Sequence, residues 1–195
     1  MVIKMQKITF VTSNIGKVAT AQKAFADTGV ELEVFAYDLI EPRSDDIKTI
    51  AEFKVMQAYN LVKQPCIALD SGFFIDALNG FPRASVNFAL DTIGIQGIIK
   101  LMENAENRSC RFKECLAYND GKEIKYFFCE HEGKIAPQIA GMDNPEKWSD
   151  LWYIYIPGDT PDNRTLAQYS AEEIKNRNGR SSFEEFVDWY VNANR

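Results

Sequence analysis

The sequence predicts an α/β fold around a mixed β-sheet, and three observations carry this prediction. β-Branched and aromatic runs alternate with segments of helical periodicity in the first half of the chain. Residues 66–69 form a continuously apolar run, which is typical of a strand buried on both faces. Two strand-like runs, 109–119 and 123–132, flank an Asn119-Asp120-Gly121 turn and predict an antiparallel hairpin. This order of elements indicates a mixed sheet flanked by helices.

The remaining elements follow from periodicity and from turn residues. Residues 7–12 predict a strand, and helical spacing runs from Lys17 to about Gly29, after the polar segment 13–16. Residues 31–36 alternate like a strand, and 46–62 predict a helix with an acidic N-cap. The apolar run at 66–69 is expected to end at Asp70. The later predictions are a turn at 81–83, a helix at 93–104, a strand at 152–156, and helices at 170–178 and 182–192, the first of these with a Ser170/Glu173 capping box.

Composition bounds the class of protein. The chain has 195 residues, 46% of them hydrophobic, and a net charge of −6, which is ordinary for one globular domain. This charge argues against a broad nucleic-acid-binding face, and no window approaches the ~20 apolar residues of a membrane span. We therefore expect neither nucleic acid nor membrane as a partner.

The cysteines and the single histidine predict no metal or redox motif. The four cysteines form no CxxC pair, and one histidine argues against a Cys/His zinc site. We expect Cys110 and Cys115 to be buried apolar residues, and His131 to be a surface-strand residue between two glutamates. Residues 1–7 lack the apolar run of a signal peptide, so we expect a reduced, cytoplasmic protein.

Two groups of residues have the chemistry to bind a phosphorylated ligand. Thr12, Ser13, Asn14 and Lys17 lie at a strand-to-helix turn, where free backbone N–H groups favour an anion. The alternative is an ordinary N-cap followed by a solvated lysine.

The second group consists of carboxylates. Asp70, in the segment Asp70-Ser71-Gly72, follows a buried strand, where α/β sheets place ligands, and Glu41 lies in an earlier loop. Together these two carboxylates could hold a magnesium ion that bridges phosphates. The alternative is a turn aspartate and an unrelated loop glutamate.

Three motifs occur in a specific order. Thr12, Asn14 and Lys17 match T-x-N-x-x-K, Leu39-Ile40-Glu41 matches a leucine-x-Glu segment, and 70–83 follows D-S-G-L-x-(I/V)-x-A-L-x-G-x-P-G almost throughout. Arg83 replaces the last glycine. With these motifs the chain resembles the inosine triphosphate pyrophosphatase family, which hydrolyses non-canonical purine nucleoside triphosphates.

The resemblance implies a fold and a mechanism. It implies an elongated mixed central sheet flanked by helices, with two lobes and a nucleotide cleft between them, in a single domain 1–195 whose second lobe is inserted at roughly 83–160. It also implies a homodimer that releases a nucleoside monophosphate and pyrophosphate. Mg²⁺ would bind at Glu41 and Asp70, with Asp70 also the general base. The implied phosphate-binding residues are Thr12, Ser13, Asn14, Lys17, Ser71 and Gly72, with further positive charge from Lys175 and Arg180.

The motifs that read the base depart from the family pattern. Trp148-Ser149-Asp150-Leu151-Trp152 stands where the family has F-G-(Y/W)-D-P, and residues 178–181 replace the Ser-His-Arg motif. Trp148 could stack on a purine and Asp150 could accept its ring N–H; alternatively, Trp148 covers the edge of the core. For Trp152 we favour a core position. We expect discrimination among bases to be weaker than in the family, or directed at another base.

Two other functions remain open on the sequence alone. One is a Maf-type pyrophosphatase acting on other modified nucleotides, and the other is a nucleotide-binding pseudoenzyme. Pyrophosphate release across a panel of nucleoside triphosphates separates the three.

Overall fold

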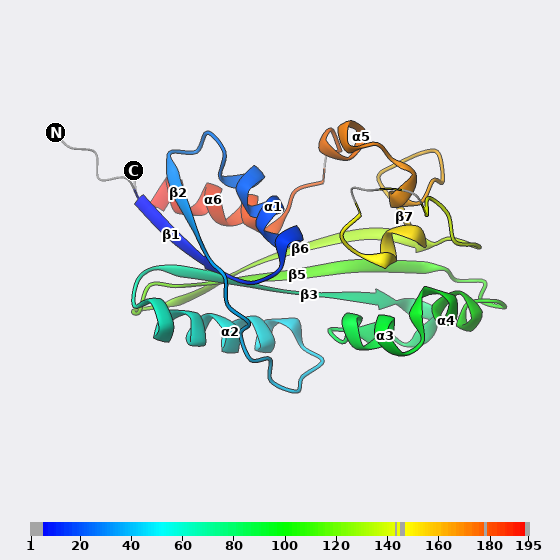
Figure 1. Ribbon diagram of the computed structural model, residues 1–195, viewed down its shortest axis with the longest axis horizontal. Coiled ribbons are helices and arrows are strands. Elements are labelled where there is room, and N and C mark those ends of the chain that lie inside the picture. Colours follow the sequence, from blue (N-terminus) through cyan, green and yellow to red (C-terminus); the bar gives the residue numbers. More distant parts are fainter. Residues whose placement is uncertain (1–5, 143, 145–146, 178, 194–195) are drawn as a thin grey trace. The chain divides into compact units, whose positions relative to one another are not determined.

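The described part of the chain contains a seven-stranded mixed sheet with helices on its faces. The computed structural model describes residues 6–142, 144, 147–177 and 179–193 (Figure 1). The strand order is β2-β1-β3-β5-β6-β7, with β4 paired to β3. β1 pairs in parallel with β2 and β3, whereas β4 and β7 are antiparallel to β3 and β6. The predicted mixed α/β architecture is confirmed.

Most elements lie close to their predicted positions. The strands are β1 Gln6–Val11, β2 Val30–Phe35, β3 Cys66–Ile75, β4 Pro82–Arg83, β5 Ser109–Asn119, β6 Ile124–Ile135 and β7 Tyr155–Pro157. The helices are α1 Ile15–Phe25, α2 Ile47–Val62, α3 Val86–Thr92, α4 Gly94–Leu101, α5 Ala171–Lys175 and α6 Ser182–Ala193. Short 3-10 helices occur at Asp76–Leu78, Asp150–Tyr153 and Leu166–Gln168. Within the described ranges, no helix has both the length and the apolar character needed to cross a membrane.

The chain divides into two compact units. The first unit consists of Met1–Ser71, Glu114–Cys129 and Arg180–Arg195, and the second of Gly72–Lys113 and Glu130–Gly179. Each unit has its own apolar core, so each is described by itself.

The core of the first unit is rich in aromatic side chains. α1 and α6 lie over one face of its strands and α2 over the other (Figure 1). Phe10 of β1 meets Phe183 of α6 edge-on at 5.2 Å between ring centroids, and Phe25 of α1 contacts Phe186 at 5.9 Å. Because β1, α1 and α6 share this core, the turn between β1 and α1 is held firmly at both ends.

The core of the second unit contains a three-ring cluster. Phe112 contacts Phe73 at 4.6 Å and Tyr155 at 4.9 Å between ring centroids. The hydroxyl of Tyr155 donates to the backbone oxygens of His131 and Glu132, at 3.2 and 2.9 Å. This buried tyrosine therefore satisfies its polar group on the backbone of β6.

Three sequence expectations were wrong in detail. β3 does not end at Asp70 but continues to Ile75, because Phe73 and Ile75 are fully buried. The predicted strand at 152–156 is a 3-10 helix followed by the shorter β7, since the apolar side chains of 151–155 are all buried and do not alternate. α3 precedes the predicted helix at 93–104, and Gly94, at a φ of 63°, separates the two.

Candidate active site

The turn between β1 and α1 is a capped helix start. Asn14 is the N-cap, and its side-chain oxygen accepts from the backbone N–H of Lys17 at 3.0 Å. The hydroxyl of Thr12 accepts from the backbone N–H of Asn14 at 3.2 Å, and the exposed hydroxyl of Ser13 donates to Asp38. The predicted cap is therefore present, and it fixes the hydroxyl and amide groups of this turn.

Lys17 is not a solvated surface lysine. Its ammonium group donates to the backbone oxygen of Leu69 at 3.2 Å, next to Asp70. Burial, together with the nearby positive charge of Lys54, lowers the pKa of Lys17 to about 8, although Asp70 and Glu41 act in the opposite direction. The contact brings the first motif to the central one, as an anion-binding site requires.

Glu41 and Asp70 lie on either side of one lysine. The Nζ atom of Lys54 is 2.7 Å from Oε1 of Glu41 and 3.2 Å from Oδ1 of Asp70. The side chains of Lys54 and Asp70 are both buried, whereas that of Glu41 remains largely exposed. The two predicted carboxylates are thus brought together around a cation.

Sequence reasoning missed Lys54. Its position on α2 follows Ile50 by four residues and Ala51 by three, so it belongs to the buried stripe of that helix. A charged residue on an apolar stripe was the available signal, because such a residue needs a partner in the interior. The partners, Glu41 and Asp70, lie in other parts of the chain.

Asp70 has the properties of a ligand or a base. Burial raises the pKa of its carboxyl group, and the positive charges of Lys54 and Lys17 oppose this rise only in part. Its Oδ2 atom is buried and has no hydrogen-bond partner among the described residues. A buried oxygen without a partner, in a carboxylate that shares Lys54 with Glu41, fits a hard cation such as Mg²⁺.

The glycine of the central motif allows two strands to approach closely. A Cβ atom at Gly72 would lie 2.7 Å from the backbone oxygen of Arg83 and 2.8 Å from the ring of Phe74. Arg83, which replaces a family glycine, has a left-handed φ of 57°. Ser71, directly after Asp70, is partly exposed. Gly72 therefore has a structural role in the packing of β3 against β4, in addition to its predicted role in phosphate binding.

The predicted base-binding residues belong to the second unit. Trp148 is exposed and meets the buried Trp152 edge-on at 5.5 Å between ring centroids. The core position favoured for Trp152 is confirmed. Asp150 begins the 3-10 helix that Ser149 caps, and its carboxylate pairs with Lys147. An exposed indole beside an acidic group can contact a flat ligand from one face.

The predicted basic residues near the C-terminus are Lys175 and Arg180, and Arg180 already has acidic partners. The guanidinium group of Arg180 pairs with Asp188 and lies 3.5 Å from Glu185, both on α6. Lys175 ends α5, but its side chain lies outside the described residues. The charge of Arg180 is thus partly neutralised by a surface ion pair.

Comparisons with known proteins agree on one family. The model of the Ham1 family matches residues 8–189. The dITP/XTP pyrophosphatase of Methanopyrus kandleri is 36% identical over 189 residues, which are 95% of this chain and 97% of the relative. That of Thermococcus kodakarensis is 37% identical over 186 residues, 94% of this chain and 96% of the relative.

Solved structures show the same fold. The Ham1 protein of Staphylococcus aureus has a TM-score of 0.76 at 22% identity and covers 97% of this chain and 100% of its own. A HAM1 protein of Coxiella burnetii has a TM-score of 0.77 at 21% identity and covers 97% of this chain and 98% of its own. The family resemblance inferred from the motifs is confirmed, and the chain belongs to the Ham1 family.

Proposed function

We propose that this protein is a magnesium-dependent nucleoside triphosphate pyrophosphohydrolase that acts on non-canonical purine nucleotides. The observation that carries the proposal is the buried carboxylate of Asp70, flanked by Lys54, Glu41 and Lys17. Relatives that cover nearly the whole chain are dITP/XTP pyrophosphatases, which supports this activity over a Maf-type enzyme. The retained acidic and basic groups also argue against a pseudoenzyme.

The triphosphate would bind at the start of α1. The backbone N–H groups there and the side chains of Thr12, Ser13 and Asn14 supply donors, and the helix dipole favours negative charge. Lys17 supplies a positive charge beside them. Ser71 and Gly72 would add polar contacts next to Asp70.

Glu41 and Asp70 are the residues that would hold Mg²⁺. The bound ion would neutralise charge on the phosphate oxygens during hydrolysis. Lys54 keeps the two carboxylates together and adds a positive charge of its own. Its contacts explain how two acidic groups persist at one place in the free protein.

Asp70 would act as the general base. Its raised pKa makes this carboxylate a better proton acceptor than an exposed aspartate. It would take a proton from the attacking water, whose oxygen bonds to phosphorus as the anhydride between the α- and β-phosphates breaks. The products are a nucleoside monophosphate and pyrophosphate, and Lys17 stabilises the charge that develops on the phosphate oxygens.

Base selection would rest on a reduced set of contacts. Trp148 would stack on the base, Asp150 would accept a ring N–H, and Lys175 and Arg180 would supply positive charge. Asp150 and Arg180 already have ionic partners, so each would contact the base with its charge partly neutralised. We therefore expect weaker discrimination of inosine from adenosine triphosphate than a site with dedicated donors achieves.

A homodimer in the cytoplasm completes the proposal. All four cysteines are free thiols, and three of them are buried, which suits a reducing compartment. The predicted burial of Cys110 and Cys115 is confirmed.

Pyrophosphate release tests the function directly. The wild-type protein should release pyrophosphate from inosine and xanthosine triphosphates when Mg²⁺ is present, and Asp70→Asn should reduce kcat by about 10²–10⁴-fold because the base is lost. The matched control is Asp76→Asn, which removes a surface aspartate paired with Arg111 in the second unit.

The same assay decides the alternatives. Wild-type turnover by Asp70→Asn at saturating Mg²⁺ would overturn the assignment of the base. Activity confined to pyrimidine nucleotides would favour the Maf-type reaction, and no release from any nucleotide that binds would indicate a pseudoenzyme. A strong inosine and xanthosine preference that survives Arg180→Ala would show that other residues read the base.

A further inference from the structure

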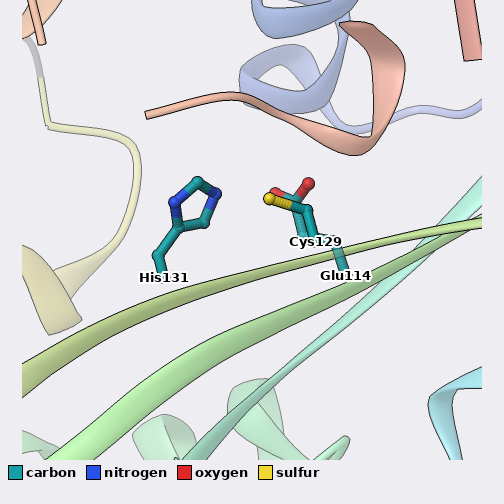
Figure 2. A group of neighbouring side chains, drawn as sticks. All are labelled: Glu114, Cys129 and His131. Carbon is teal, nitrogen blue, oxygen red and sulfur yellow. The ribbon is translucent and has the colours of Figure 1, made fainter. Parts of the chain in front are cut away.

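We propose that Glu114, Cys129 and His131 form a binding site for a divalent transition metal, with Zn²⁺ as the ion that fits best. One carboxylate oxygen, the Sγ atom and one imidazole nitrogen all lie within 4.8 Å of one another. Figure 2 shows the three side chains on the same side of their strands, with the sulfur directed toward the ring. The site uses none of the residues assigned to the triphosphate or to Mg²⁺.

Strand geometry places these residues together. Cys129 and His131 are two residues apart on β6, so their side chains project from the same face. Glu114 lies on β5, the neighbouring strand in the sheet. All three are partly buried, so an ion can reach them while the surrounding chain limits their motion.

The spacing is close to that of a zinc centre. Zinc lies about 2.0–2.3 Å from nitrogen, oxygen and sulfur ligands, which places the ligand atoms of a tetrahedral site about 3.3–3.8 Å apart. The described atoms therefore need to approach by at most about 1–1.5 Å, which small side-chain rotations can supply. Three protein ligands leave a fourth position for water or another ligand.

The donor set distinguishes this site from the magnesium site. Thiolate and imidazole are ligands for zinc and related transition metals, whereas Mg²⁺ takes oxygen ligands. Glu41 and Asp70 offer only oxygen. Two sites with different donors would therefore select different ions.

Hydrogen bonds hold two of the three side chains in the metal-free protein. The backbone N–H and hydroxyl of Ser182 donate to Oε2 of Glu114 at 3.3 and 2.9 Å. Hydrogen bonds of this kind hold metal-binding carboxylates in place, and Oε1 can then act as the ligand atom. The thiol of Cys129 donates to the backbone oxygen of Arg180 at 2.8 Å.

Metal binding would change the second of these contacts. The S–H···O bond to Arg180 gives way to a sulfur–metal bond, and the thiol proton passes to solvent. Because a proton is released, the affinity should rise with pH. Arg180 lies two residues before α6 and Ser182 is its first residue, so metal binding would change contacts at the start of this helix.

The other thiols are poor competitors. Cys66, Cys110 and Cys115 are buried, and burial raises the pKa of Cys66 and of Cys115 to about 12. A thiol must lose its proton to bind a metal, so these three stay unreactive. A cysteine signal from the folded protein therefore reports on Cys129.

Cobalt is the spectroscopic probe, used on the untagged full chain after treatment with a chelator. Co²⁺ should give a near-ultraviolet thiolate charge-transfer band and intense visible bands of tetrahedral coordination. Zn²⁺ should abolish both, and competition with a chromophoric chelator gives its Kd. Cys129→Ser should remove the charge-transfer band. Cys129→Ser and His131→Gln should each raise the Zn²⁺ Kd by about 100-fold or more, and Ser182→Ala by about tenfold.

Glu132→Gln is the matched control. Glu132 is exposed on β6 and alternates with His131, so it faces the other side of the strand. This variant should bind Co²⁺ and Zn²⁺ like the wild type, and circular dichroism checks that every variant is folded. Absence of the charge-transfer band in the wild type, or equal Zn²⁺ affinity in wild type and Cys129→Ser, would overturn the proposal. A Kd raised as much by Glu132→Gln as by His131→Gln would also overturn it.

Discussion

Two charged clusters each place one cationic side chain between an aspartate and a glutamate, but they differ in exposure to solvent. In the first unit Lys54 lies between Glu41 and Asp70, and in the second unit Arg164 lies between Asp162 and Glu173. The side chains of Lys54 and Asp70 are only 11% and 6% exposed, whereas those of Arg164 and Glu173 are 36% and 44% exposed. The clusters therefore differ mainly in their access to water.

Burial decides what each carboxylate can do. Desolvation raises the pKa of Asp70 in spite of its two cationic neighbours. In the exposed cluster the hydrogen bond from Arg164, together with the bonds from Ser170 at the start of α5, lowers the pKa of Glu173 to about 2. The first carboxylate can take up a proton, while the second is a permanent anion that caps a helix.

The largest effect is expected from Lys54→Met. Removing the cation leaves a buried carboxylate opposite Glu41, which should cost about 3 kcal/mol of unfolding free energy. Thermal unfolding measures this, and Mg²⁺ should raise the Tm of the variant more than that of the wild type, since it replaces the lost charge. Lys48→Met, an exposed position on the same helix, is the control. Equal losses in the two variants would show that burial does not distinguish Lys54.

A smaller, pH-dependent effect is expected from Lys17. With a pKa of about 8, Lys17 is charged below that pH and loses its proton as the pH rises through it. The kcat/KM for a triphosphate should therefore fall above pH 8, because kcat/KM reports the free enzyme. Lys17→Arg keeps the charge and should move this fall to higher pH.

The pH profile needs a control on the same helix. Lys23→Arg changes an exposed lysine of α1 and should leave the profile unchanged. Identical profiles for wild type and Lys17→Arg would mean that Lys17 is not the group that titrates.

The smallest effect is expected from Glu173→Gln. The exposed ion pair with Arg164 is screened by water, so the Tm should fall less than for Lys54→Met, and kcat should not change. High salt should remove the difference between Glu173→Gln and wild type but leave that of Lys54→Met largely intact. A Tm loss for Glu173→Gln that resists salt would contradict the contrast between the clusters.

Local signals predicted much of the fold. The capping box of Ser170 and Glu173 and the N-cap at Asp46 occur as expected, because each depends on residues three or fewer positions apart. The continuation of β3 past Asp70 could not be predicted in this way. Asp70-Ser71-Gly72 has the composition of a turn, yet β3 continues through it and pairs with β4 at Phe73 and Phe74, and the absence of a side chain at Gly72 permits this close approach.

The sequence alone indicated which groups could bind a phosphorylated ligand. Lys17, Glu41 and Asp70 were singled out because their motifs have a fixed order and spacing; all three lie within residues 8–189, which the Ham1 family model matches, and their roles stay predictions. Tertiary structure decided that Lys54 joins Glu41 and Asp70, and that Glu114 on β5 meets Cys129 and His131 on β6. The physical reason is that a partner distant in sequence is chosen by strand pairing and helix packing. For the same reason, a single histidine without a zinc motif does not reveal in the sequence which residues will lie beside it in the fold.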